Sequence, residues 1–136
     1  MVSTSIDKER IEKTLNKLID YNRDFYITKN NLRLFIKENL DIVLDDLIAG
    51  DKIFYTENSV VCVVGYADKV NRKYLKIVTD TLSEIPKVLF EVFFNTDCDL
   101  YIKLKKDNSL IPVLKEFDFV FFGGRGHEVL LKYTRI

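Results

Sequence analysis

The chain has 136 residues, 47% of them hydrophobic and 31% charged, which is enough for one folded domain with a buried core. Lysine plus arginine equals aspartate plus glutamate at 21 each, so the net charge gives no general attraction to nucleic acid or to an anionic membrane. The polar N-terminus and the short apolar runs predict a cytoplasmic protein with no signal peptide and no membrane partner. Cys62 and Cys98 are expected to be reduced thiols, and without neighbouring histidines they predict no metal site.

The first third of the chain has mainly helical periodicity. Residues 7–21 place their apolar side chains on one helical face, and residues 24–28 form a short extended candidate. Thr28 is then expected to cap a second helix, whose apolar face carries Leu32, Phe35, Ile36 and Leu40. A third helical run follows and stops at Gly50, either continuous with the second helix or separate from it.

After Gly50 the apolar pattern becomes extended. Residues 52–57 and 60–65 are predicted strands joined through Asn58 and Ser59 as a hairpin. The second of these is apolar on both faces, which indicates a central strand. Residues 73–79 are the next predicted strand.

Helix and strand then alternate. Residues 82–93 predict a helix in which Pro86 is tolerated because it lies in the first turn. Residues 100–105 alternate as a strand, and residues 107–109 supply cap residues for a short helix that holds Leu110, Val113, Leu114 and Phe117.

The chain closes with a predicted β-hairpin. Two runs rich in aromatic and β-branched residues flank Gly123, Gly124 and Gly126, and we expect the turn among them to need positive φ. The aromatic residues within 90–94 and 117–122 are expected mainly in the core, and any that stayed exposed would mark a protein interface.

This order of elements predicts an α/β (α+β) fold in a single domain spanning residues 1–136. We expect a mixed, mostly antiparallel central sheet of about six or seven strands with helices on both faces, because strands separated by helices need crossover connections.

The C-terminal third carries a resemblance to a known family. Residues 107–119 followed by 120–133 resemble the last helix, the aromatic that ends it and the closing hairpin of the GNAT superfamily of N-acetyltransferases. By element order the resemblance extends back to about residue 24, so the helix within residues 1–22 would be an addition. The Lys- and Asn-rich composition without tryptophan is similar to that of small acetyltransferase-like proteins of bacteriophages.

The resemblance implies transfer of an acyl group from acetyl-CoA or another acyl-CoA to an amine. In the family, backbone N–H groups at a glycine-bearing Q/R-x-x-G-x-G/A turn hold the cofactor diphosphate. The corresponding turn here, residues 79–86, has no glycine, contains Asp80 and Glu84, and loses one donor at Pro86. An ordinary self-capped helix start is the alternative interpretation. The candidate cofactor-binding residues are Thr79, Thr81, Leu82, Ser83 and Asn108.

The family's catalytic positions are only partly filled. The tyrosine that protonates the departing thiolate in many members corresponds to Leu114, which cannot donate a proton, and the glycine before the closing aromatic corresponds to Asp118. His127 and Glu128 are the candidate catalytic residues, as a base for the amine. Arg125 is the candidate for binding an anion or a partner; an exposed turn arginine is the other interpretation.

Two functions stay open, and with them whether the protein is an enzyme. The first is an acyl-CoA-dependent N-acyltransferase acting on a small amine or a protein amine. The alternative is a non-catalytic binding or assembly module on the same fold, for example a bacteriophage virion or host-interaction protein. A protein partner or a homo-oligomer is compatible with either function, and the expected location is a bacterial host cytoplasm or a virion. Nucleic acid is not indicated.

Overall fold

The computed structural model describes residues 2–18, 26–29, 32–35, 52–57, 59–66 and 72–135. Its helical elements are α1 (Lys8–Leu18), the short 3-10 helix η1 (Leu82–Glu84), α3 (Ile85–Asn95) and α4 (Leu110–Glu116). Its strands are β1 (Tyr26–Lys29), β2 (Leu32–Phe35), β3 (Lys52–Tyr55), β4 (Val60–Tyr66), β5 (Lys73–Thr79), β6 (Leu100–Lys105), β7 (Val120–Arg125) and β8 (Glu128–Tyr133). The third predicted helix, which ends at Gly50, lies outside the described residues.

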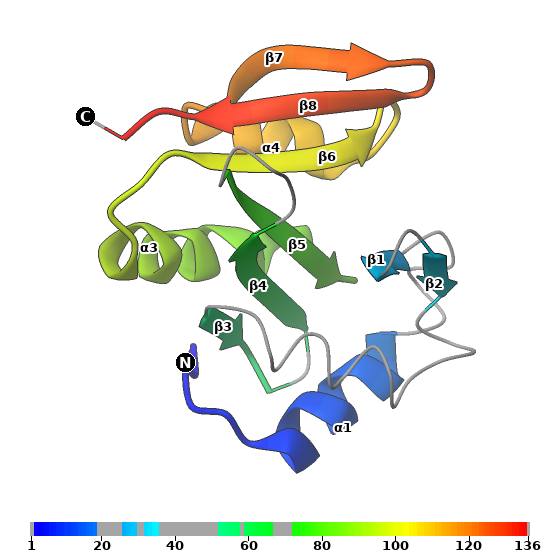
Figure 1. Ribbon diagram of the computed structural model, residues 1–136. Coiled ribbons are helices and arrows are strands. Elements are labelled where there is room, and N and C mark those ends of the chain that lie inside the picture. Colours follow the sequence, from blue (N-terminus) through cyan, green and yellow to red (C-terminus); the bar gives the residue numbers. More distant parts are fainter. Residues whose placement is uncertain are drawn as a thin grey trace.

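A six-stranded sheet in the order β3-β4-β5-β6-β8-β7 organises the molecule (Figure 1). The β5–β6 pair is parallel and the other neighbours are antiparallel, which confirms the predicted mixed, mostly antiparallel sheet. β4 lies between β3 and β5, as its two apolar faces predicted. A separate two-stranded sheet is formed by β1 and β2.

The predicted second helix is wrong over residues 32–35, which form strand β2. Lys29 pairs with Leu32, so β1 and β2 are antiparallel with only two residues between the paired positions. The sequence has Asn30 and Asn31 there, and asparagine is favoured in tight turns because it tolerates positive φ. The segment Leu-Arg-Leu-Phe fits both the helix period and the strand period, and its pairing with β1 makes it a strand.

α3 and α4 pack against one face of the six-stranded sheet. The cluster between them and the sheet includes Cys62 and Leu75 from the strands and Leu89 and Leu114 from the helices. Side chains that alternate with these along β4, such as Val61, are also buried, so both faces of the sheet are covered at β4. α1 contacts β4 and β5 and buries Ile11, Leu15 and Leu18.

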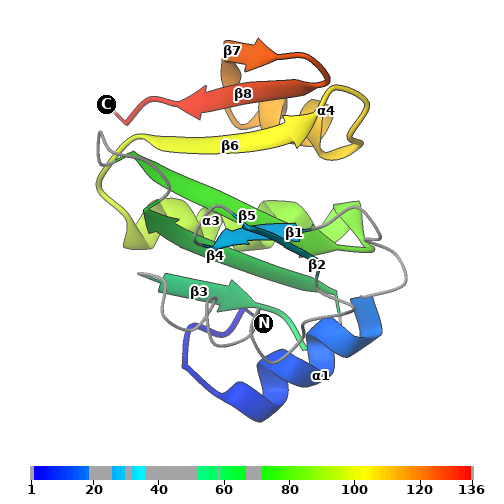
Figure 2. The ribbon, with the colours of Figure 1, turned by 45° about the vertical axis from the view of Figure 1, so that its right-hand side comes forward.

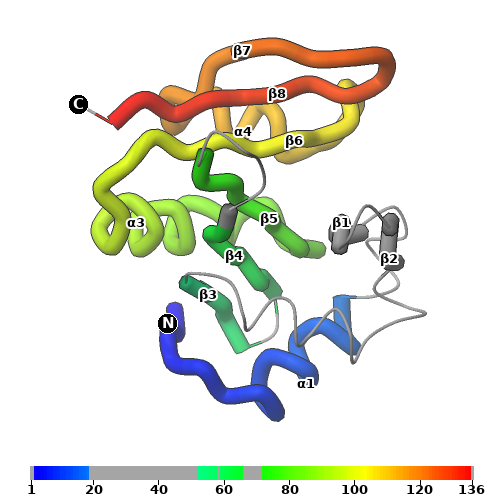
Figure 3. Tube along the Cα trace, in the orientation of Figure 1, coloured from blue at the N-terminus to red at the C-terminus, as the bar shows by residue number. Residues whose placement is uncertain are grey.

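The N-terminal segment continues the sheet past β3. The N–H of Ser3 donates to the carbonyl of Tyr55 at 2.7 Å, and the N–H of Tyr55 donates to the carbonyl of Ser3 at 2.9 Å. Figure 3 shows the N-terminus beside β3 accordingly. The outer edge of β3 is therefore partly covered by the chain's own backbone.

The closing hairpin is confirmed, but its turn differs from the prediction. Gly123 and Gly124 lie within β7, and Arg125 pairs with Glu128, so the turn consists of Gly126 and His127. Gly126 has a φ of 63°, and His127 has no positive φ, the pattern of a type II′ turn with glycine in its first central position. Asp118 has a φ of 68°, so aspartate here adopts the left-handed conformation that glycine adopts most easily.

The prediction that the C-terminal aromatics are mainly core is wrong for four of them. Phe119 is buried, but the exposed large side chains include Phe90, Phe94, Phe121 and Phe122. On α3 the inward face is filled by Ile85, Val88, Leu89 and Val92, which leaves the phenylalanines at positions 90 and 94 on the outer face. β7 lies at the sheet edge, where less of each side chain can be covered.

The two cysteines differ in environment, which predicts selective labelling. Both are free; Cys62 is fully buried and Cys98 is partly exposed. Burial raises the pKa of the Cys62 thiol from 9.0 to about 12, so at pH 8 it stays a thiol and reacts slowly. We expect one equivalent of thiol reagent to react at Cys98 in the folded protein and a second only after unfolding, measured by mass spectrometry. Because the folded pKa is raised, the stability linked to Cys62 is complete below pH 9 and falls as the pH rises toward 12. Rapid labelling of both thiols in native protein would contradict the buried position of Cys62.

Candidate functional site

The central feature of the candidate site is the divergence of β5 from β6. Sheet pairing between them joins only Lys73 with Leu100 and Tyr74 with Tyr101, at the start of both strands. β5 pairs with β4 along its whole length, and β6 does so with β8, so each strand stays in its own half of the sheet. The two halves separate toward the carboxyl ends of β5 and β6 (Figure 2). Carboxyl ends of neighbouring parallel strands are common ligand positions in α/β folds.

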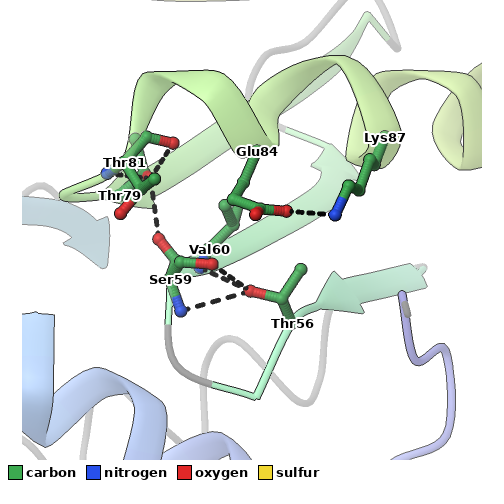
Figure 4. Close-up of polar contacts among 7 residues, drawn as sticks. All are labelled: Thr56, Ser59, Val60, Thr79, Thr81, Glu84 and Lys87. Atoms are coloured by element: carbon green, nitrogen blue, oxygen red, sulfur yellow. Dashed lines mark hydrogen bonds and ion pairs between the residues drawn. The ribbon is translucent and has the colours of Figure 1, made fainter.

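The turn from β5 into α3 lies at one side of this divergence, and its threonines are held by local hydrogen bonds (Figure 4). The Thr79 hydroxyl donates to the carbonyl of Ser59 at 2.7 Å, and the N–H of Thr81 donates to the Thr79 hydroxyl at 3.0 Å. The Thr81 hydroxyl donates to the Asp80 carboxylate at 2.7 Å. These two side chains therefore shape the turn, but neither caps the helical segment: Thr81 precedes η1 without a side-chain cap hydrogen bond, so the self-capped helix start considered from the sequence is not observed.

Backbone donors are nevertheless present where the helical segment begins. The N–H of Glu84 donates to the carbonyl of Thr81, but the N–H groups of Leu82 and Ser83 find no acceptor among the residues that the structure describes. The side chains of Leu82 and Ser83 are exposed, so solvent or a ligand can reach the N–H groups of these two residues. Free N–H groups at a helix start bind anions because they point outward and the helix dipole is positive there.

The charges around this turn include a cation that the sequence analysis did not single out. Lys87 Nζ lies 2.8 Å from the carboxylate of Glu84, so the acidic side chain expected beside the diphosphate is paired. Asp80 is exposed. Pro86 lies in the first turn of α3, as predicted. The i, i+3 spacing of Glu84 and Lys87 was the sequence signal for this pair.

Asn108 lies at the carboxyl end of β6, in the other half of the sheet from Thr79. Its side-chain oxygen accepts a hydrogen bond from the N–H of Leu110 at 2.8 Å, which holds the turn that leads into α4. The structure thus brings Thr79, Thr81, Leu82 and Ser83 together at the end of one strand and places Asn108 after the next strand.

Leu114 is fully buried in the core cluster and does not line an exposed surface. Its carbonyl accepts hydrogen bonds from the N–H groups of Phe117 and Phe119, which closes α4. The side chain at the position of the family's tyrosine therefore packs as core and supplies no acid.

The remaining candidates lie at the tip of the closing hairpin. His127 is exposed in the two-residue turn, Glu128 begins β8, and Arg125 ends β7 with its side chain exposed. Glu128 pairs with Arg125 on one side and with Lys105 on the other. In the sheet order β6 separates this tip from β5, so the structure does not place these residues next to Thr79.

The residues that the structure describes contain neither a metal-binding group nor a membrane-spanning helix. No group of three or more histidine, cysteine or acidic side chains there could hold a metal ion. In that same part of the chain, no helix is both long and apolar enough to span a membrane.

The sheet order, the one parallel pair among the described strands and the helices on the sheet define a GNAT-type acetyltransferase fold. No family model matches the sequence, and no curated protein matches it. Solved structures do match: an N-acetyltransferase from Staphylococcus aureus Mu50 has a TM-score of 0.67 and 14% identity, covering 98% of this chain and 96% of that chain. The structure of yncA from Salmonella typhimurium with its cofactor acetyl-CoA has a TM-score of 0.64 and 8% identity, with 98% and 92% covered. An acetyltransferase of the GNAT family from Streptococcus pneumoniae has a TM-score of 0.57 and 13% identity, with 98% of each chain covered. At these identities the likeness shows the fold.

Proposed function

We propose that this protein is an acyl-CoA-dependent N-acyltransferase with a diphosphate site that lacks glycine. The observation that carries the proposal is the divergence of β5 and β6 after Tyr74 and Tyr101. Amide groups of an extended acyl-pantetheine arm can pair with the main chain of a diverging strand, as an added strand would. The acetyl-CoA in the structure of yncA, which has the same fold, supports this choice of cofactor.

The diphosphate is assigned to the start of the η1 and α3 segment. The N–H groups of Leu82 and Ser83 are the proposed donors, and Lys87 is a cation of the same segment. Asp80 and Glu84 oppose an anion there, and Pro86 supplies no N–H. We therefore expect weaker cofactor binding than a glycine-bearing turn gives. Asn108 is proposed to contact the cofactor from the β6 side with its amide nitrogen, because its oxygen already accepts a hydrogen bond from the N–H of Leu110.

Acyl transfer requires the amine nitrogen to attack the thioester carbon and the carbon–sulfur bond to break. His127 and Glu128 are the proposed acceptors of the amine proton, directly or through water, because they lie at the carboxyl end of β6. Leu114 cannot protonate the departing thiolate, so we assign that proton to water. A thiolate of ordinary pKa, about 8.5, can leave in this way near neutral pH at a reduced rate. Small polyamines and peptide α-amines are the acceptor classes to screen.

Titration with acetyl-CoA tests the proposal. Binding to the folded state should raise the melting temperature as ligand is added, and calorimetry should give a one-to-one complex. Ser83→Asp places a negative charge on the proposed diphosphate site, while a carboxylate at a helix start favours the helix itself. We expect this variant to keep the melting temperature of the ligand-free protein and to weaken acetyl-CoA binding about tenfold.

Thr4→Asp is the matched control, because it adds the same charge at an exposed residue before α1. It should leave acetyl-CoA binding unchanged. Absence of any thermal shift at millimolar acetyl-CoA would overturn the proposed function. Binding without release of free CoA thiol in the presence of any amine would retain the cofactor site and reject the transfer reaction.

A further inference from the structure

The two outer edges of the six-stranded sheet differ in how far other parts of the chain cover them. Ser3 covers part of the β3 edge through two backbone hydrogen bonds to Tyr55. At the opposite edge, no strand in the described part of the chain pairs with the outer side of β7 (Figures 1 and 2). An open edge presents a row of N–H and C=O groups that another strand can pair with.

The side chains of β7 do not protect this edge. Val120, Phe121 and Phe122 are 56%, 64% and 47% exposed. The run from Val120 to Gly124 contains no charged residue and no proline, the residue types by which natural proteins discourage pairing at an edge. A bulge lies between Phe121 and Gly123, and the ring of Phe122 packs against Tyr101 at 5.6 Å. Phe121 is thus the most exposed apolar side chain of the edge.

Opposite charges bracket the apolar run. Asp118 precedes it and Arg125 ends it, and both side chains are exposed. When two such runs lie antiparallel, the start of one is beside the end of the other, so each Asp118 meets an Arg125. Parallel runs would place like charges together. The β7 edge is therefore complementary to itself in the antiparallel arrangement alone.

We propose that β7 is the site of homodimerisation, where a second copy of this chain pairs with it antiparallel about a two-fold axis. The apolar residues Val120 to Phe122 of the two copies then cover one another, and two Asp118–Arg125 ion pairs close the ends. This interface is independent of the proposed cofactor site, because β6 and β8 lie between β7 and β5. A single short strand per copy buries an area at the low end for stable complexes, below about 1,200 Å², so we expect a Kd in the micromolar range.

Sedimentation velocity of the full chain from about 1 to 100 µM tests the proposal in a range that spans a micromolar Kd. The wild type should convert from monomer to dimer over this range. Phe121→Lys and Arg125→Asp should each raise the dimer Kd at least about tenfold while circular dichroism stays that of the folded protein. Phe94→Lys is the matched control for an exposed phenylalanine on α3, and Lys13→Asp is the control for charge reversal on α1. Neither control should change the Kd.

Exchanging the charges at positions 118 and 125 tests whether the two residues form ion pairs between copies. It separates this role from a local effect of Arg125→Asp on the closing hairpin. Arg125→Asp combined with Asp118→Lys restores opposite charges only between two copies that lie antiparallel. The double variant should therefore recover a dimer Kd within about threefold of the wild type, at some cost in monomer stability because position 118 has positive φ. A wild type that stays monomeric at about 100 µM, or a dimer that all β7 variants retain, would overturn the proposal.

Discussion

Gly124→Ala is expected to destabilise the protein by about 1–3 kcal/mol, because the added methyl group overlaps the backbone of the neighbouring strand. A Cβ atom at this position would lie 2.6 Å from the carbonyl oxygen of Glu128 and 3.2 Å from the Cα of Val129. Both atoms belong to the main chain of β8, so no side-chain rotation relieves the overlap. β7 must move away from β8 or detach. The measurement is urea unfolding followed by tyrosine fluorescence, since the chain contains no tryptophan.

Gly123→Ala is the matched control, one residue away on the same strand. A Cβ atom there meets nothing within 4 Å, and the residue has no positive φ. Alanine reduces the conformational freedom of the unfolded chain, so this variant should gain about 0.4–1 kcal/mol. The two neighbouring substitutions therefore have opposite signs. Equal losses at both positions would contradict the close approach of β7 and β8 at Gly124.

Two strands were predictable to the residue. The runs 73–79 and 100–105 are rich in apolar residues and have polar residues on both sides, and the structure has β5 and β6 with these bounds. Residues 32–35 were not predictable in this way, because Leu32, Leu34 and Phe35 satisfy both the strand and the helix period. Pairing with β1 decides between the two, and that contact lies outside the segment itself.

Which elements carry the candidate residues was predictable, whereas the geometry between these elements was not. The turn after β5 was located by its place between a predicted strand and the following helix, and Leu114 was located by its distance along the chain from Phe119. The early end of β5–β6 pairing is a contact between strands far apart in sequence, and no period along one strand encodes it. Gly124 illustrates the same limit: three glycines suggested a turn, but only the strand across from it explains why this one has no side chain.

The aromatic residues show how burial divides a set that composition treats alike. Phe119 and Phe94 both belong to aromatic runs, yet Phe119 is 1% exposed and Phe94 is 87% exposed. The exposed fraction of each ring depends on where the residue lies in the fold, for example on the inner or outer face of a helix or at a sheet edge. The residue type alone does not specify this position. The two positions therefore form a matched pair for mutation.

Phe119→Ala is expected to cost about 3–5 kcal/mol, the range for deleting a buried aromatic ring. The ring of Phe119 lies 6.2 Å from that of Phe93 and 5.6 Å from that of Tyr133, so it joins α3 to the last strand. Alanine would leave a cavity at this junction. Because a domain of this size is stabilised by only about 5–15 kcal/mol, the variant should unfold at much lower urea concentration and should be partly unfolded near 37 °C.

Phe94→Ala removes the same number of atoms from an exposed position and should change the stability by no more than about 0.5 kcal/mol. Both variants are measured by urea unfolding at low protein concentration, where dimerisation makes no contribution. A large loss for Phe94→Ala would mean that the outer face of α3 is covered in solution. A small loss for Phe119→Ala would contradict the core position between α3 and β8, and with it the packing that holds the closing hairpin against the rest of the fold.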